Sequence, residues 1–462
     1  MGALLAVLAQ SGCSAPAKVP PRNAPAAGEV DPAGAHRAAV AAQVQPYLDS
    51  EIVSGVVVGL YDVGKLEIYG FGKGPAGKPP NGHTLYELGS ITKVYTNLLL
   101  ADAVQRREVE LDTPVAELLP PGVTVPTRDK TAITLKHLAL HSSGLPKLPP
   151  SLVTRKVPPD PYASYGEDAL YQDLIGTELV TPPGTQIAYS NYGAGLLGFA
   201  LGRKLGAGYA KALETRVLAP LGLRETFVTV AASAGAHRML GTDDDLRPAP
   251  RWTWGALAGA GVITSTARDQ LRMIDLELDA AAGSKGPMRP QLRLTQEPQL
   301  ENDGDNQSLG WMIDPAGRYW HNGGTGGFRS YISFDPKTKR GVVVLASTAT
   351  TLVDFLGRAM VDVLDGTAKP PPARPTPVQR TSYVGKYDFT GTVLSVVVAD
   401  HRLYLEGPGE PRHRMAPITD RAFWIEGLQA AAQFVVGKDG AVENLVFKVG
   451  DRQIVAPRTP GQ

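Results

Sequence analysis

The chain has 462 residues, of which 43% are apolar and 20% are charged, and its 46 Lys and Arg residues nearly balance 45 Asp and Glu residues. The net charge of +1 supplies no general attraction for nucleic acid or acidic lipid, and the apolar content excludes a chain that is disordered throughout. At about 150 residues per domain, the length predicts two or three domains. No apolar run approaches the ~20 residues that a membrane-spanning helix needs.

The first 35 residues combine a short apolar run with a low-complexity stretch. The run Gly2–Ala9 is followed by small residues and by Cys13, the sole cysteine of the chain. Such a run indicates a secretory signal, and the step Ser11-Gly12-Cys13 resembles a bacterial lipoprotein cleavage site. The Ala-, Pro- and Gly-rich residues 16–32 are typical of a flexible tether. We therefore expect export to the periplasm or cell envelope, with Cys13 as a candidate lipidation site; the alternative is an N-terminus without a targeting role.

Residues 36–366 have the pattern of one large domain in which helices and strands alternate. Gly55–Tyr61 and Lys65–Gly70 flank Asp62-Val63-Gly64, which predicts two strands around a tight turn. The β-branched run Gly341–Ala346 predicts a buried strand that closes the domain. Five of the fifteen residues from Gly366 to Arg380 are proline, so we expect a stiff extended linker over 367–380 and a domain boundary there.

Residues 381–462 predict a small antiparallel β-domain, either a sheet or a barrel. Short β-branched and aromatic runs recur there at hairpin spacing with Gly and Asp between them. The polar residues are scattered, so we expect a role in packing or accessory binding, or a solvated structural appendage. The runs are Tyr383–Tyr387, Val393–Val398, Arg402–Leu405, Ala422–Ile425, Gln433–Val436 and Asn444–Lys448.

The first motif that carries chemistry is Ser90-Ile91-Thr92-Lys93, just before the apolar run Leu98–Val104. At about 100° per residue, Ser90 and Lys93 share one face of a helix, one turn apart. A serine hydroxyl is a poor nucleophile until a base takes its proton, and a lysine in a partly dry site is able to do so. One Ser-x-x-Lys match is expected by chance in a chain of this length, so its context must decide.

The second motif is Tyr189-Ser190-Asn191, which precedes the apolar stretch Gly195–Ala200. A tyrosine beside the Ser/Lys pair serves either as a phenolate base or as a proton relay to the leaving group. Asn191 is a candidate for holding the substrate and Lys93. Tyr95-Thr96-Asn97 has the same spacing, but Tyr95 lies about 140° round the helix from Ser90. We therefore interpret Tyr95 as a packing residue.

The third motif is the glycine-rich stretch from His321 to Gly327, which reads His-Asn-Gly-Gly-Thr-Gly-Gly. Its glycines suit an edge strand that a substrate approaches closely. No Gly-Lys-Ser/Thr follows, so nucleotide binding is disfavoured. A backbone N–H of this strand, together with the N–H of Ser90, makes a two-donor oxyanion hole for a substrate carbonyl.

In this order the three motifs resemble those of the penicillin-recognising serine hydrolases, the superfamily of class C β-lactamases and D-alanyl-D-alanine carboxypeptidases. The stretches Ile133–Pro146, Val217–Leu223 and Gly261–Asp269 resemble further landmarks, and the likeness extends over residues 40–365. The third motif departs from the Lys-Thr-Gly or Lys-Ser-Gly of class C β-lactamases, and a neutral His attracts a carboxylate less than Lys does. His141–Pro149 and Pro161–Tyr165 resemble carboxypeptidase/endopeptidases of the AmpH type.

The resemblance implies an α+β fold, a β-lactamase/transpeptidase-like arrangement of a helix-flanked antiparallel sheet and an all-α lobe with the site between them. It also implies a lipocalin-like C-terminal β-domain. The roles it implies are Ser90 as the acylated nucleophile, Lys93 and Tyr189 as the proton-handling pair, Asn191 as a substrate contact, His321, Asn322 and Gly323 as the third motif, and the amides of Ser90 and Gly324 as the oxyanion hole. No cofactor and no metal are implied.

The activity implied is that of a serine hydrolase acting on D-Ala-containing cell-wall peptides and able to bind penicillin. The same constellation suits a β-lactamase or a small-ester esterase, and a non-catalytic muropeptide or penicillin sensor is an alternative from another class. The expected partner is an acyl substrate rather than nucleic acid, and we expect a monomer.

Two further patterns have simpler interpretations. His137 and His141 are four residues apart, but no Glu follows His137 as a metalloprotease needs. Gly193-x-Gly195-x-x-Gly198 satisfies a dinucleotide fingerprint, but it follows a turn rather than a parallel strand. We expect helix packing at these glycines.

Overall fold

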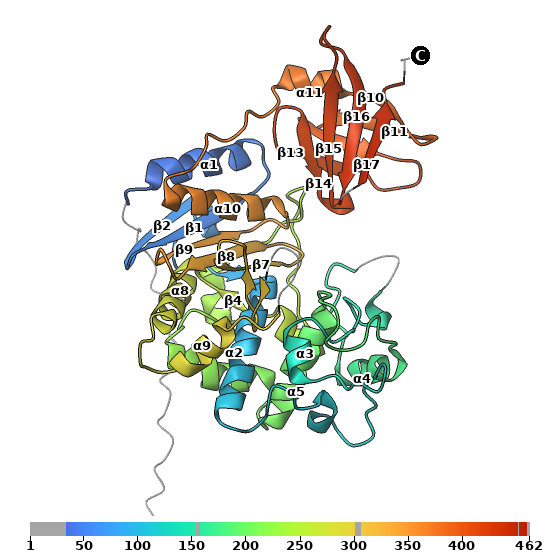
Figure 1. Ribbon diagram of the computed structural model, residues 1–462. Helices are drawn as coiled ribbons and strands as arrows, with labels where there is room; N and C mark the ends of the chain where they lie inside the picture. The colour runs from blue at the N-terminus through green and yellow to red at the C-terminus, as the bar shows by residue number, and fades with distance from the viewer. Residues whose placement is uncertain (1–33, 154–157, 301–305, 451, 460–462) are drawn as a thin grey trace, which may run out of the picture.

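The computed structural model describes residues 34–153, 158–300, 306–450 and 452–459. Figure 1 shows a sheet with helices on both faces, an all-helical lobe beside it and a separate β-domain at the C-terminal end. The fold is therefore the α+β arrangement that the resemblance implied. The candidate lipidation site at Cys13 lies outside the described residues.

The central sheet has seven antiparallel strands in the order β2-β1-β9-β8-β7-β6-β5. The tight turn expected at residues 62–64 joins β1 to β2, and β9 is the strand expected at 341–346. The strands are β1 (Gly55–Asp62), β2 (Lys65–Gly72), β5 (Asn306–Gln307), β6 (Met312–Ile313), β7 (Tyr319–Gly324), β8 (Arg329–Asp335) and β9 (Arg340–Ala346).

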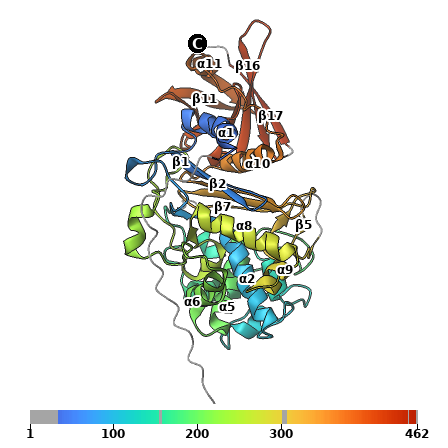
Figure 2. The same ribbon diagram turned by 90° about the vertical axis from the view of Figure 1, so that its left-hand side faces the viewer.

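Both faces of this sheet are buried, which explains why β1 is an almost continuous apolar run. Alternate side chains Val56 and Val58 pack under α1 (Arg37–Asp49) and α10 (Leu352–Asp365). On the opposite face Gly59 leaves room for α8 (Ala267–Ala281), because a Cβ there would lie 3.0 Å from Leu271. Figure 2 shows α1 and α10 on one side of the sheet and α8 on the other.

The helical lobe lies on the α8 side of the sheet and is built around α2 (Thr92–Gln105), of which twelve residues are buried. Helix α5 (Asn191–Lys204) packs closely on the turn Gly255–Ala260, since a Cβ at Gly198 would lie 2.7 Å from Gly259. The glycines of the dinucleotide-like fingerprint are therefore packing residues. The remaining helices are α3 (Leu135–Ala139), α4 (Glu167–Gly176), α6 (Gly208–Leu213), α7 (Ala219–Leu221) and α9 (Arg289–Gln296), with the two-stranded pair β3 (Tyr86–Glu87) and β4 (Thr264–Ser265).

The C-terminal domain is an eight-stranded antiparallel meander from β10 to β17. An isolated bridge between Tyr387 in β10 and Arg458 after β17 brings the first strand beside the last, so the sheet nearly closes into a barrel. Aromatic side chains fill its interior; Tyr383 and Phe434 stack at 4.1 Å. The strands are β10 (Gly385–Phe389), β11 (Thr392–Ala399), β12 (Arg402–Glu406), β13 (His413–Pro417), β14 (Ala422–Ile425), β15 (Ala430–Val436), β16 (Val442–Val449) and β17 (Arg452–Pro457).

Two expectations for the C-terminal third need correction. The expected linker over 367–380 ends early, because its last four residues belong to helix α11 (Pro377–Tyr383). The Thr376 hydroxyl caps this helix and Pro377 stands at its first position, where the missing N–H costs nothing. Strands β13 and β17 were not expected, since Arg, His and Pro in the first and Gln in the second interrupt the apolar pattern.

In the part of the chain that the structure describes, none of the helices combines the length and the apolar character needed to cross a bilayer.

Candidate active site

Ser90 lies in a 3₁₀ turn, η2 (Gly89–Ile91), that runs directly into α2. Gly89 has φ 54°, and a Cβ there would lie 2.5 Å from the backbone N of Gly324. Both the left-handed conformation and the close approach therefore require glycine at position 89. The turn places Ser90 at the end of α2 that meets the sheet.

Lys93 is buried beside Ser90, as the i, i+3 spacing predicts. Its Nζ lies 2.9 Å from Ser90 Oγ, 2.9 Å from Asn191 Oδ1 and 2.8 Å from the carbonyl oxygen of Ala260. Lys93 is 1% exposed, and burial lowers the pKa of its ammonium well below the usual range. The amine form is favoured, because a buried charge loses its hydration.

The hydrogen bonds of a neutral Lys93 form a closed set. A neutral amine has two N–H donors and one lone pair. The amide oxygens of Asn191 and Ala260 only accept, so they take both N–H donors. The lone pair is left for the hydroxyl hydrogen of Ser90, which is the arrangement a general base requires.

Tyr189 completes the surroundings of Ser90 from the other side. Its hydroxyl donates to Ser90 Oγ at 2.7 Å, and its ring centroid lies 4.9 Å from Lys93 Nζ. Desolvation of its hydroxyl raises the pKa of Tyr189, which keeps it a phenol rather than a phenolate. Of the two roles open from the sequence, the geometry favours the proton relay, with Lys93 as the base.

The position of Tyr189 follows from the start of α5. Ser190 is the N-cap of this helix, and its hydroxyl accepts from the N–H of Gly193 at 2.9 Å. Tyr189 immediately before the cap points to Ser90, and Asn191 immediately after it reaches Lys93. The His141 ring packs on the Tyr189 ring, with centroids 4.5 Å apart.

The third motif lies on β7, whose far edge faces η2. Strand β6 pairs with β7 only at Tyr319 and Trp320, which leaves this edge of His321–Gly324 to the nucleophile turn. The N–H of Thr325 donates to Phe328 at 3.0 Å, so by antiparallel alternation the next pair, Gly324 and Arg329, turns its backbone groups outward. The N–H of Gly324 thus points away from β8.

Gly323 is the closest contact between β7 and the nucleophile turn. A Cβ at Gly323 would lie 1.9 Å from the carbonyl oxygen of Leu88 and 2.8 Å from the N of Ser90. Only glycine allows this approach, and it brings the amide of Gly324 beside that of Ser90. Two such donors side by side are the arrangement that an oxyanion hole requires.

The two histidines of the site are neutral at physiological pH. Burial, and then the nearby Lys93, lower the pKa of His321 to about 3, and the same two causes lower the pKa of His141 to about 3. The Nδ1–H of His321 donates to the carbonyl oxygen of Asn322 at 2.6 Å. The third motif therefore carries no positive charge of its own, in contrast to a lysine at the same place.

A cavity of about 460 Å³ extends from Lys93 along the start of β7. This volume is in the range of small-molecule sites. Its polar lining groups other than Lys93 are amides, hydroxyls and neutral histidines. The lining residues are Lys93, Thr96, Asn97, Leu138, Ala139, His141, Ile187, Tyr189, Ala194, Leu197, Asn306, Gln307, Gly310, Trp311, Met312 and His321.

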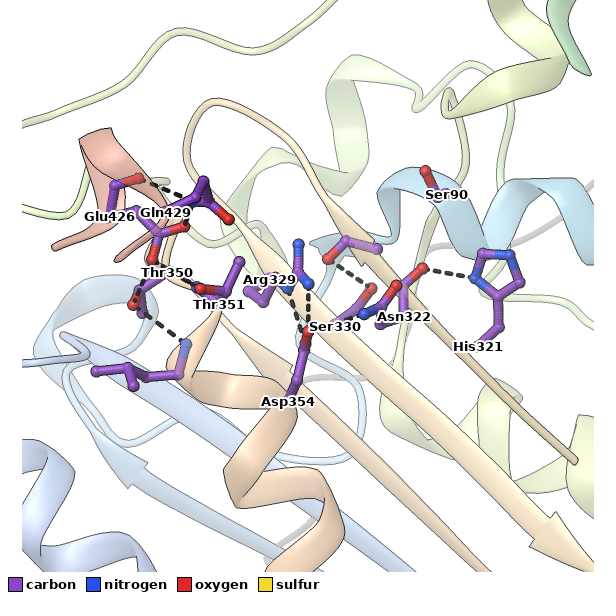
Figure 3. A network of polar contacts seen from close by, with 12 residues as sticks. Ser90, His321, Asn322, Arg329, Ser330, Thr350, Thr351, Asp354, Glu426 and Gln429 are labelled. Carbon is purple, nitrogen blue, oxygen red and sulfur yellow. Dashed lines mark hydrogen bonds and ion pairs between the residues drawn. The ribbon is translucent and has the colours of Figure 1, made fainter. Parts of the chain in front are cut away.

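Behind the third motif lies a polar network that the sequence did not reveal. The Asp354 carboxylate accepts from Asn322 Nδ2 at 2.8 Å and from Arg329 Nε at 2.8 Å, and Arg329 Nη2 contacts it as well. Figure 3 shows these groups side by side next to His321, below Ser90. Asp354 is 32 residues from Asn322, so no local spacing could have identified it. Ala260, whose carbonyl oxygen accepts from Lys93, was also not expected from the sequence. This residue directly precedes the stretch Gly261–Asp269, which resembles a landmark of the family.

The remaining candidates from the sequence have structural roles. His137 accepts from the N–H of Thr134 in the capping box of α3, while His141 accepts from the N–H of Ser190. The two rings thus have separate partners. Tyr95 is fully buried and bonds to Gln270, as expected for a packing residue. Among the described residues no cluster of three or more His, Cys, Asp or Glu side chains is placed to hold a metal ion.

Comparison with known proteins agrees with this geometry. The family profile described as Beta-lactamase matches residues 40–366. A beta-lactamase of Escherichia coli (strain K12) is 27% identical over 341 residues, covering 66% of this chain and 86% of the relative. The D-alanyl-D-alanine-carboxypeptidase/endopeptidase AmpH of the same organism is 28% identical over 283 residues, covering 58% of this chain and 72% of the relative.

A solved structure gives the same result. The class C beta lactamase from Rhodobacter sphaeroides has a TM-score of 0.61 and 27% sequence identity to this chain, covering 71% of this chain and 99% of that structure. The profile match ends at residue 366, so it leaves out the C-terminal β-domain.

Proposed function

The chain belongs to the beta-lactamase family and is a serine hydrolase, and from this premise we propose that it is a D-alanyl-D-alanine carboxypeptidase/endopeptidase-type cell-wall peptide hydrolase that also binds penicillin. The observation that carries the proposal is that Lys93 and Tyr189 both hydrogen-bond to Ser90 Oγ, beside a third motif that has no charge. The similarity to AmpH supports the same substrate class.

In the acylation step Ser90 is the nucleophile and Lys93 the base. The neutral amine of Lys93 takes the hydroxyl proton as Ser90 Oγ bonds to the carbonyl carbon of the substrate. The amides of Ser90 and Gly324 stabilise the oxyanion. Lys93, now an ammonium, has a third N–H for the proton relay, while Asn191 and Ala260 keep the other two.

Collapse of the tetrahedral intermediate breaks the C–N bond of the substrate. The leaving nitrogen takes a proton from the Tyr189 hydroxyl, and the Lys93 ammonium, whose Nζ lies 4.9 Å from the Tyr189 ring centroid, returns a proton to the phenolate. The products of this step are a free amine and an ester on Ser90. Water then attacks the ester, Lys93 and Tyr189 carry its proton, and the acid is released.

The charge of the site favours substrates whose scissile bond is far from a free carboxylate. His321 is neutral, Arg329 is paired with Asp354, and Lys93 has its three partners within the protein. The positive charges of the described site are therefore largely engaged within the protein. An internal amide, the bond cut by an endopeptidase, fits this lining better than a C-terminal D-Ala-D-Ala carboxylate.

A β-lactamase or small-ester esterase of the same fold is the second candidate. The beta-lactamases among the relatives favour the first of these activities, and the neutral cavity favours the second. Deacylation distinguishes the two functions, because a β-lactamase must hydrolyse its penicilloyl ester quickly. A sensor without catalysis, the third candidate, binds the same ligands and turns none over.

For the N-terminal segment we propose export and lipidation of Cys13, on the sequence pattern of residues 2–13. Labelled palmitate incorporated by the wild type and not by Cys13→Ser is the supporting result, and labelling of neither protein contradicts it.

The experiment that tests the proposed function follows the intact mass of the protein after a penicillin is added, together with release of products from cross-linked and D-Ala-D-Ala-terminated peptides. We expect a lasting adduct on Ser90, none on Ser90→Ala, and faster cleavage of the cross-linked peptide. Rapid loss of the adduct with hydrolysed drug indicates the β-lactamase. Peptide cleavage at full rate by Ser90→Ala refutes the proposal.

A further inference from the structure

Among the contacts between the C-terminal β-domain and the catalytic domain are those of one carboxylate, Glu426. This residue begins the turn η8 (Glu426–Leu428) between β14 and β15. Its Oε2 accepts from the N–H of Thr351 at 2.8 Å, from the Thr351 hydroxyl at 3.0 Å and from the Thr350 hydroxyl at 3.2 Å. Trp424 donates to the same oxygen at 2.8 Å and holds the carboxylate in place.

These contacts lie at the N-terminus of α10. Thr351 is the N-cap residue of this helix, but its side chain makes no capping hydrogen bond. The first N–H groups of the helix bond to Thr350 and Thr351, and the Glu426 carboxylate holds these two threonines. The N-terminus of a helix also favours negative charge. A residue of the β-domain therefore stabilises the first turn of a helix in the catalytic domain.

The same first turn of α10 carries Asp354, which reaches the active site. Asp354 accepts from Asn322 on β7 and from Arg329 on β8. Arg329 pairs directly with Gly324, and its Nη1 lies 3.0 Å from the place of a Cβ at that glycine. Figure 3 shows Glu426 and Gln429 beside Thr350 and Thr351, and Asp354, Arg329, Asn322 and His321 beside one another. The N–H of Asp354 donates to the carbonyl oxygen of Thr351 at 3.0 Å and so joins the two groups.

We propose that Glu426 is a positioning residue for catalysis: by fixing the first turn of α10 it fixes Asp354, and through Asn322 and Arg329 it keeps the oxyanion strand β7 against Ser90. The C-terminal domain is then part of the catalytic apparatus rather than an appendage. This inference rests on the acylation of Ser90 proposed above.

The domains have further contacts that do not depend on Glu426. The Tyr404 hydroxyl donates to Asp245 at 2.8 Å, and Arg414 Nη2 donates to the carbonyl oxygens of Ser50 at 3.0 Å and Glu51 at 2.9 Å. Loss of Glu426 therefore leaves the β-domain docked. Tyr404→Phe is a matched control, because it removes one interdomain hydrogen bond that does not lead to α10.

The test compares Glu426→Ala, Glu426→Gln and Tyr404→Phe in the full chain. We expect Glu426→Ala to lower the rate of Ser90 acylation about tenfold, since a shift well under 1 Å is enough for such a loss. Glu426→Gln keeps an oxygen acceptor and recovers most of the rate, and Tyr404→Phe acylates as the wild type does. Thermal unfolding of each variant shows whether the domains stay folded.

A double-mutant cycle tests the route through Asp354. If Glu426 acts through Asp354, Glu426→Ala has no further effect on acylation in an Asp354→Asn background, whereas independent damage adds. Wild-type acylation by Glu426→Ala, an equal loss in Tyr404→Phe, or additive losses in the cycle overturn the inference alone. A wild-type protein that no acylating probe modifies overturns the proposed function and this inference with it.

Discussion

A single methyl group at Gly323 is expected to uncouple the oxyanion strand from the nucleophile. The added Cβ of Gly323→Ala would lie 1.9 Å from the carbonyl oxygen of Leu88, 2.7 Å from Ser330 Oγ and 2.8 Å from the N of Ser90. The atoms of Leu88 and Ser90 belong to the backbone, so these two clashes cannot be relieved by a change of side-chain rotamer. To reach even 3.0 Å from Leu88, β7 must withdraw from η2 by about 1 Å.

The expected losses follow from that displacement. A misplacement of about 1 Å costs on the order of 10²-fold in rate, since the Gly324 amide no longer meets the oxyanion that Ser90 forms. Overpacking costs about 1–3 kcal/mol of stability, which leaves a domain of this size folded. The assay is the rate at which a fluorescent penicillin or a fluorophosphonate labels Ser90, with circular dichroism on the same samples.

Gly176→Ala is the control, because it adds the same methyl group where no atom lies within 4 Å. We expect it to be labelled at the wild-type rate. A folded Gly323→Ala protein that is labelled as fast as the wild type refutes the argument that this contact sets the geometry of the oxyanion hole.

Three further predictions concern charge. Lys93→Ala lowers the rate of acylation by about 10²–10⁴-fold, because the general base is lost. In the wild type this rate falls only when the pH drops through the lowered pKa of Lys93. A stopped-flow pH series that shows no such fall contradicts the role of Lys93 as the base. Burial raises the pKa of Glu277 to about 8, so its contribution to stability is complete below its ordinary pKa of 4.5 and is lost as the pH rises through 8. The free energy of unfolding of Glu277→Gln therefore rises relative to that of the wild type by up to about 1.4 kcal/mol per pH unit across that window. Urea unfolding from pH 4 to 9 measures both, and free energies that change in parallel with pH contradict the prediction. His321→Lys introduces a cation into the third motif. We expect it to raise the rate of acylation by a carboxylate-bearing penicillin relative to the rate with a neutral ester. An unchanged ratio of the two rates shows that charge at this position does not select the substrate.

The parts of the site that the sequence determined are those set by local geometry. The spacing of Ser90 and Lys93 places both on one helical face whatever the rest of the chain does. The glycines of the third motif indicate that another backbone segment or a substrate approaches this strand closely, because glycine has no Cβ in the way. The β-branched runs of β1 and β9 likewise predicted buried strands, since such runs suit few other structures.

The properties that depend on burial and on distant partners were decided by the tertiary structure. The partners of Lys93 Nζ include Asn191 and Ala260, which lie 98 and 167 residues further along the chain. His321 is neutral because the fold removes its ring from water. Desolvation and hydrogen bonding set protonation, and neither can be read from residue spacing.

The link between the two domains was also decided by the tertiary structure. Asp354 and Glu426 are ordinary acidic residues in the sequence, with no motif around them. Asp354 contacts the third motif because α10 packs on β8, and Glu426 contacts the start of the same helix because η8 lies beside it. The sequence therefore singled out the candidate chemical residues by their spacing, while long-range packing decided their burial and their distant partners.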